Sequence, residues 1–215
     1  MASSEKEQFC GLMAGLFSPP KREIVDEIRK EGVFSFLANA VKSWVGDSAL
    51  LDGLQVSGPQ EVFHAELQEE YHRLFSGGEK ESISLIESPH KPWTQDPECR
   101  LSFAREKGFL KGDAALHMEA IFQKLCIEVP EPFRDCPDHL VVELEFLSAL
   151  YGKATDREVK QFIQDHLDWI PQLKKEMMEL RSHSFYLSAI ELLDLFLTRE
   201  KDRLEKIDYG ETSFH

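Results

Sequence analysis

The residues with the clearest chemical potential lie at the start of an apolar segment near position 140. Asp138 and His139 follow Pro137, and Glu143 comes four residues after His139, so on a helix the imidazole and this carboxyl share one face. Such a group suits acid–base chemistry, because a carboxyl and an imidazole can exchange a proton. The plainer interpretation is structural: Asp138 caps a helix through the free N–H groups of its first turn, and His139 and Glu143 form a surface ion pair.

The rest of the chain supplies little that an active site needs. It has no phosphate-binding glycine loop, no nucleophile elbow and no H-E-x-x-H metal motif. His64 with His72, or His139 with Glu143, would hold a metal only with ligands from distant helices, and the ligand set of a di-iron bundle is missing. The sequence therefore predicts a protein that is not an enzyme and that has neither a metal site nor a cofactor.

The length and composition suit a cytosolic protein of one large domain or two small ones. The chain has 215 residues, a formal net charge of −14 and four cysteines without a C-x-x-C pair, which suits reduced thiols rather than a disulfide framework. The acidic balance disfavours nucleic acid and anionic lipid as partners and favours a basic partner. No apolar run approaches the roughly 20 residues of a membrane span, and the first residues lack the features of a signal peptide. We therefore expect a cytoplasmic protein without membrane insertion.

Apolar residues recur at helical spacing through most of the chain. Helices are predicted from the Ser4/Glu7 capping box, from Ser18-Pro19 to Gly32, across 33–44, from Asp47, from Pro59 to Gly77-Gly78, from Asp96-Pro97 to near Gly108, from Asp113, from Asp138, from the Thr155/Glu158 capping box and from His183 past Leu204. No convincing strand or hairpin pattern appears. The sequence predicts an all-α fold: one globular domain over residues 1–215 with about ten to eleven helices, a long loop at 78–95 and a frayed tail at 208–215.

Three segments together resemble the TorD/DmsD family of redox-enzyme maturation chaperones, also called the NarJ/TorD-like family. They are Glu70-Tyr71-His72-Arg73-Leu74-Phe75-Ser76-Gly77, Pro137-Asp138-His139 with its apolar helix, and His183-Ser184-Phe185-Tyr186. Two weaker likenesses are Glu87-Ser88, where Ile86 replaces the family's first aromatic and the next aromatic comes only at Trp93, and His166-Leu167-Asp168-Trp169, which is shifted by one residue from the family's H-L-x-x-W.

The resemblance implies a TorD-like helical chaperone of the cytoplasm. Members of the family bind the twin-arginine signal peptide of a molybdoenzyme catalytic subunit of the DMSO/TMAO-reductase type, and some bind the apoenzyme, until the cofactor is inserted. The peptide groove expected from the resemblance and from the charges consists of Tyr71, Leu74, Phe75, Glu87, Ser88, Trp93, Asp138, His139 and Glu143. Its carboxylates would face the arginines, and His139, partly protonated by neighbouring acids, would orient Asp138 or bond the client backbone.

Two other functions stay open at this point. One is a helical interaction adaptor unrelated to redox enzymes, and the other is a helical enzyme that binds a small molecule or a metal. The sequence does not identify the client. Because relatives can exchange helices between protomers, a homodimer is also open. Some relatives are suspected of binding guanine nucleotides, but no segment here resembles a nucleotide-binding loop.

Overall fold

The computed structural model describes residues 1–215 apart from 46–48, 56–57, 77–81 and 212–215. The described part has no strand and holds one isolated antiparallel bridge, between Ile86 and His139. Its α-helices are α1 (Ser3–Leu16), α2 (Arg22–Arg29), α3 (Glu31–Val45), α4 (Gln60–Phe75), α5 (Asp113–Leu125), α6 (Leu140–Lys153), α7 (Asp156–His166), α8 (Ile170–Glu179) and α9 (Ser184–Glu211), and its 3-10 helices are η1 (Ala49–Leu54), η2 (Ser88–His90) and η3 (Glu131–Phe133). The predicted all-α class is confirmed.

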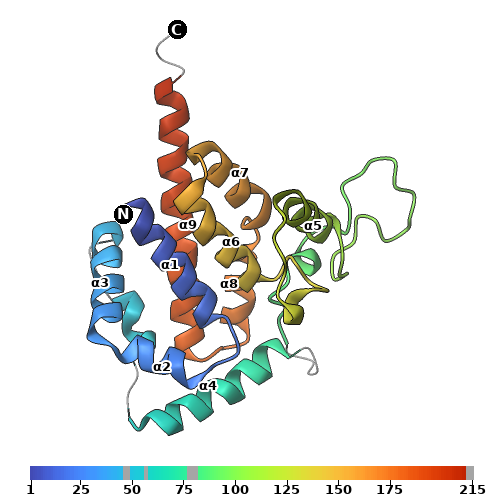
Figure 1. Ribbon diagram of the computed structural model, residues 1–215. Helices are drawn as coiled ribbons and strands as arrows, with labels where there is room; N and C mark the ends of the chain where they lie inside the picture. The colour runs from blue at the N-terminus through green and yellow to red at the C-terminus, as the bar shows by residue number, and fades with distance from the viewer. Residues whose placement is uncertain (46–48, 56–57, 77–81, 212–215) are drawn as a thin grey trace.

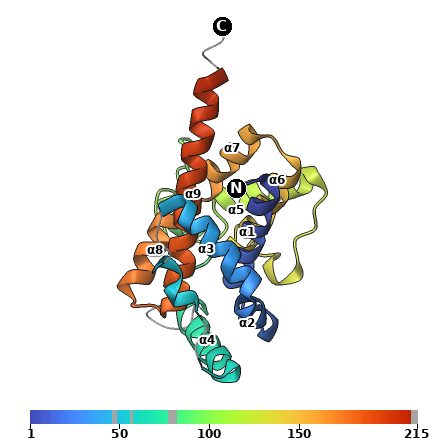
Figure 2. The same cartoon turned by 90° about the vertical axis from the view of Figure 1, so that its left-hand side faces the viewer.

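The long helix α9 is the element around which the others are arranged. It runs through the molecule in both views, and its C-terminal turns extend beyond the neighbouring helices (Figures 1 and 2). Its buried side chains recur at spacings of three, four and seven, which places them on one side of a helix: Tyr186, Ile190, Leu193, Leu197 and Leu204. Helices α1, α7 and α8 and the short η1 pack against it.

The core between α1, α6 and α9 combines aromatic rings with one buried ion pair. The rings of Phe9 and Phe196 lie 4.4 Å apart between centroids. Lys6 Nζ lies 2.8 Å from a carboxylate oxygen of Glu200, and the Tyr151 hydroxyl donates to the same oxygen at 3.2 Å. A charge taken out of water needs such partners, so these polar contacts fix α1 and α6 against α9.

The contact between η1 and the start of α9 depends on a glycine. A Cβ on Gly53 would lie 2.3 Å from the backbone oxygen of Ser184, which is far inside van der Waals contact. Only a residue without a side chain lets the two backbones approach this closely.

The helix predicted from Asp96-Pro97 to Gly108 is wrong, because this segment consists of turns that extend away from the helices (Figure 1). The backbone of Trp93 donates to Glu106 O at 3.0 Å, and Thr94 N donates to Ala104 O at 2.9 Å. The carbonyl oxygens of Ala104 and Glu106 therefore accept from the residues that precede the segment, and not from N–H groups of a helix.

Helix ends differ from their predicted positions by a few residues in several places. The Thr155/Glu158 capping box of α7 is confirmed. By contrast, α1 begins at Ser3, where Glu5 reaches back to Ala2 N at 2.6 Å, so the box at Ser4 is wrong.

Other predicted boundaries shift as well. Helix α2 begins at Arg22 rather than at Pro19, and Gly32 lies inside α3. Helix α9 continues to Glu211, and residues 212–215 of the predicted frayed tail lie outside the described residues. The predicted start at Asp47 lies outside the described residues. Among the helices that the structure describes, none is both long enough and apolar enough to cross a membrane.

Candidate functional site

Asp138 joins two segments that are fifty residues apart in the chain, and it does not cap a helix. Its carboxylate accepts from the backbone N of Ser88 at 2.9 Å and from the Ser88 hydroxyl. Next to this contact, Glu87 N donates to Asp138 O at 2.9 Å and Leu140 N donates to Leu85 O at 2.8 Å. The predicted cap is therefore wrong, because the carboxylate is used by the loop that lies alongside.

His139 takes the capping position instead. Helix α6 begins at Leu140, and Nδ1 of His139 accepts from Val141 N at 3.2 Å. Its ring lies 4.8 Å from the ring of Phe133, and burial lowers the pKa of His139 to about 4. The expectation that neighbouring acids keep this ring partly protonated is wrong, since desolvation opposes the charged form.

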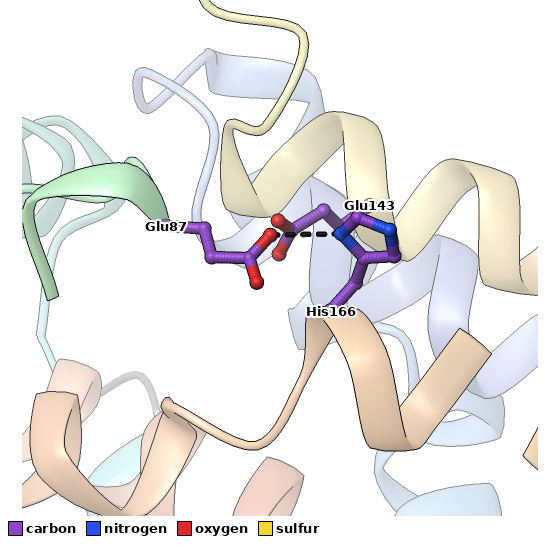
Figure 3. Close-up of side chains that lie close together, drawn as sticks. All are labelled: Glu87, Glu143 and His166. Carbon is purple, nitrogen blue, oxygen red and sulfur yellow. Dashed lines mark hydrogen bonds and ion pairs between the residues drawn. The ribbon is translucent and has the colours of Figure 1, made fainter. Parts of the chain in front are cut away.

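Three buried side chains from different elements meet near the start of α6 (Figure 3). Glu87 follows the bridge residue Ile86, Glu143 lies in the first turn of α6, and His166 ends α7. His166 Nδ1 lies 2.9 Å from Glu87 Oε2. Because a carboxylate only accepts hydrogen bonds, the proton of this contact belongs to the imidazole nitrogen.

The two carboxyls are in opposite protonation states. Burial, together with the charge of Glu87, raises the pKa of Glu143 well above its usual range. Burial would also raise the pKa of Glu87, but the hydrogen bond from His166 and the charge of Lys91 outweigh it and lower that pKa. Glu143 therefore favours its neutral, protonated form beside the charged Glu87 carboxylate, and both of its buried oxygens lack a hydrogen-bond partner among the described residues.

Lys91 completes this group, which we call the Glu87 cluster (Glu87, Lys91, Glu143 and His166). Lys91 Nζ lies 2.5 Å from Glu87 Oε1 and 2.5 Å from Asp168 Oδ1, and it donates to a backbone oxygen of α7 at 2.7 Å. The cluster therefore ties the segment around η2 to α7, with Glu143 of α6 packed beside Glu87. A buried carboxylate with two such donors is held in one place.

The Glu87 cluster also contains side-chain atoms of the kinds that bind metal ions. One atom each from Glu87, Glu143 and His166 lie within 4.8 Å of one another, a spacing that suits a metal ion. However, the Lys91 ammonium and the His166 N–H already supply the positive partners of Glu87. These distances are those of a hydrogen bond and an ion pair and account for the charge of Glu87, whereas both buried oxygens of Glu143 have no hydrogen-bond partner among the described residues.

The apolar half of the predicted groove lies in a different place. Leu74 is fully buried, whereas Tyr71 and Phe75 are half-buried, with ring centroids 5.1 Å apart. Phe75 packs on Tyr186 at 5.6 Å, and the Tyr71 hydroxyl donates to Phe17 O at 3.4 Å. No hydrogen bond or ring contact among the described residues joins these α4 side chains to the Glu87 cluster.

Trp93 forms a third, separate location. Its indole Nε1 donates to Leu110 O at 3.3 Å, and its ring lies 5.2 Å from that of Phe103. The ring is partly exposed beside the turns that follow η2.

The nine predicted site residues thus fall into three groups. Glu87, Ser88, Asp138 and Glu143 are each at most 1% exposed, so they do not form an acidic rim that a partner could touch. Their place in a peptide site stays a prediction.

The sequence reasoning missed two members of the Glu87 cluster. His166 had a weak signal in its likeness to H-L-x-x-W, but its contact with Glu87 is not visible in the spacing. Lys91 had none, because it lies in a segment without periodicity.

The other family-like segments also join distant elements. His183 N donates to Glu70 Oε1 at 2.7 Å, and Arg73 Nε donates to the same carboxylate at 2.7 Å. The Tyr186 hydroxyl donates to Leu67 O at 3.2 Å. These contacts hold α4 against the start of α9.

A family model and two similar curated proteins point to the same family. The family model described as nitrate reductase delta subunit matches residues 48–175. The chain is 30% identical over 114 residues to "Chaperone protein TorD" of Vibrio vulnificus (strain YJ016), which covers 47% of this chain and 53% of that protein. It is 32% identical over 103 residues to the protein of the same name from Vibrio parahaemolyticus serotype O3:K6 (strain RIMD 2210633), covering 42% and 48%. The match spans about half the length of these curated relatives.

Proposed function

This chain belongs to the nitrate reductase delta subunit family, to which the TorD-like chaperones are related, and from that membership we propose that it is a chaperone for the maturation of a molybdenum-containing redox enzyme. It binds the catalytic subunit in the cytoplasm, recognises the twin-arginine leader of that subunit and releases the subunit once the cofactor is in place. It makes and breaks no covalent bond of its own.

The observation that carries this proposal is the position of the family match. Residues 48–175 include all nine side chains that the resemblance assigns to a peptide site and all four members of the Glu87 cluster. The relatives named as chaperones support the same class of function. A helical adaptor or a metal-dependent enzyme has no comparable support.

The charge of the chain also supports a cationic partner. A net charge of −14 attracts a leader that carries arginines and speeds its encounter. Among the nine residues, Tyr71, Phe75, Trp93 and His139 are partly exposed and can meet a client directly. The buried acids contribute by holding loop 82–95 and α6 in place.

The test is direct binding of a leader peptide to the full chain. We expect a labelled synthetic peptide with two consecutive arginines before an apolar stretch to bind with a Kd in roughly the micromolar range, measured by fluorescence anisotropy. Added salt should weaken it. A scrambled peptide of the same composition is the control. Equal binding of both peptides would remove leader recognition from the proposal.

A second measurement addresses the apoenzyme. Purified chain should retain the cofactor-free catalytic subunit of a molybdoenzyme on a column and release the cofactor-loaded form. Retention of neither form, for a subunit whose leader does bind, would confine the function to the leader.

A further inference from the structure

An open hollow of about 510 Å³ lies between α5, α6 and α7. This volume falls within the roughly 300–1,000 Å³ that ligand pockets usually occupy. Helix α5 lies beside α6 and α7 (Figure 1), and two ring contacts hold it there: Phe122 on Phe146 at 5.5 Å and His117 on His166 at 4.9 Å. The hollow is the space that these two contacts leave between the helices.

The floor of the hollow is apolar and comes from all three helices. Ile121 and Leu125 face it from α5, Phe146 and Leu150 from α6, and Phe162 from α7. Residues four apart lie on one side of a helix, so α5 and α6 each present a short apolar row, and α7 adds one aromatic ring. Leu125 is 53% exposed. An apolar row that the chain itself leaves uncovered is suited to a partner.

The rim on the α7 side carries negative charge. Glu158 and Asp165 line that side, and Lys124 lies on the α5 side. Hydrogen bonds from Thr155 lower the pKa of Glu158, so its carboxyl is charged at neutral pH. A partner that carries apolar side chains next to positive charges therefore fits best when its positive charges face α7.

The inner end of the hollow is connected to the Glu87 cluster. His166 lines the hollow, and its Nε2 lies 2.8 Å from His117 Nδ1 while its Nδ1 binds Glu87. In the contact between His166 and His117 one imidazole nitrogen donates and the other accepts. The cluster thus fixes the residue that joins α7 to α5.

We propose that the α5–α6–α7 hollow seats the leader of the client subunit, with its apolar side chains on Ile121, Leu125 and Phe162 and its arginines against Glu158 and Asp165. The inference rests on the proposed function and adds the place of binding, which differs from the groove that the family-like segments indicate. In this arrangement the leader binds as a helix, and its apolar side chains, at helical spacing, enter the hydrophobic groove.

Two leucines of α5 provide a matched test. Leu125 lines the hollow and is 53% exposed, whereas Leu116 is 56% exposed on the same helix and does not line it. Leu125→Glu should weaken the binding of the leader peptide about tenfold or more, measured as the Kd by anisotropy, because it replaces an apolar contact by a charge that must be desolvated. Leu116→Glu should change it less than about twofold. Circular dichroism checks that both variants are folded.

Charge is tested in the same assay. Asp165→Lys should weaken binding and reduce its dependence on salt, while Glu205→Lys, on an exposed turn of α9, should leave the affinity nearly unchanged.

The outcomes separate this inference from the proposed function. If the wild-type chain does not prefer the leader to its scrambled control, the proposed function fails. If it does, but Leu125→Glu binds like Leu116→Glu while Tyr71→Ala and Phe75→Ala bind weakly, the function stands and the hollow is the wrong place. A wild-type dimer that Leu125→Glu converts to monomer, with peptide affinity unchanged, would assign the hollow to a second copy of this chain and overturn the inference.

Discussion

The neutral ring of His139 gives a prediction about acid stability. Its Nδ1 accepts the hydrogen bond that starts α6, and burial lowers its pKa from an ordinary value near 6.5 to about 4. A proton on Nδ1 would remove that acceptor and place a charge against the ring of Phe133. Replacement by asparagine keeps a capping oxygen but removes the titration.

The sign and size of the effect follow from linkage. Between about pH 6.5 and 4 the unfolded chain binds a proton at this position and the folded chain does not, so the free energy of unfolding falls as the pH falls through that window. Below the folded pKa both states are protonated and no further loss occurs. Over the full window the free energy of unfolding falls by roughly 3 kcal/mol, and about 2 kcal/mol of this is lost between pH 7 and pH 5. Water at the partly exposed edge of the ring makes these figures upper values.

The assay is urea unfolding followed by circular dichroism at both pH values. His139→Asn should lose about 2 kcal/mol less than the wild-type chain on acidification, whatever its stability at neutral pH. His72→Asn, at an exposed position of α4, should behave like the wild type. Identical losses in the wild type and in His139→Asn would show that this ring is not held neutral, and the account of the α6 start would have to be abandoned.

Two further predictions concern stability. Glu143→Gln should lower the free energy of unfolding by less than about 1 kcal/mol, because a neutral amide replaces a neutral carboxyl of nearly the same shape. Glu87→Gln should lower it by about 3 kcal/mol, because it leaves Lys91 without its buried counter-charge. Urea midpoints at neutral pH measure both, and equal losses would contradict the assigned protonation states. Gly53→Ala should lower the free energy of unfolding by about 2 kcal/mol or more, because the new Cβ meets the backbone at the start of α9. Gly32→Ala, inside α3 with nothing within 4 Å of the new Cβ, should raise it by roughly 0.5–1 kcal/mol. The melting temperatures of the two variants, measured by calorimetry, should shift in opposite directions.

The fold was predictable from the sequence where one helix face decides the burial. The apolar rows of α4 and α9 are long enough to identify both helices from spacing alone. The segment after Asp96-Pro97 has a good cap and three apolar residues, yet it pairs its backbone with Trp93 and Thr94 instead. A single sequence does not show which of two hydrogen-bonding arrangements the surrounding structure supports.

The site was less predictable, because its contacts join residues that are far apart in the chain. Nothing near Asp138 indicates that its carboxylate is taken by Ser88, and nothing near Lys91 indicates Glu87 or Asp168 as partners. The burial of Glu143 did leave a signal. It lies between Val142 and Leu144 in a helix start that is apolar on every side, and a carboxyl in such a place is expected to be neutral.

The buried position of the family-like acids separates two kinds of variant. Asp138, Glu143 and Glu87 hold a loop to two helices, so changing them should lower the free energy of unfolding while the folded molecules keep most of their affinity for the leader. Changing Leu125 at the hollow should weaken leader binding and leave the free energy of unfolding nearly unchanged, because more than half of the surface of this side chain is already in water. If Glu87→Gln instead abolished leader binding at a temperature where circular dichroism still shows a folded chain, the acids would have to reach the client through a rearranged loop. The buried conformation would then be a resting state, and the peptide site would include the Glu87 cluster.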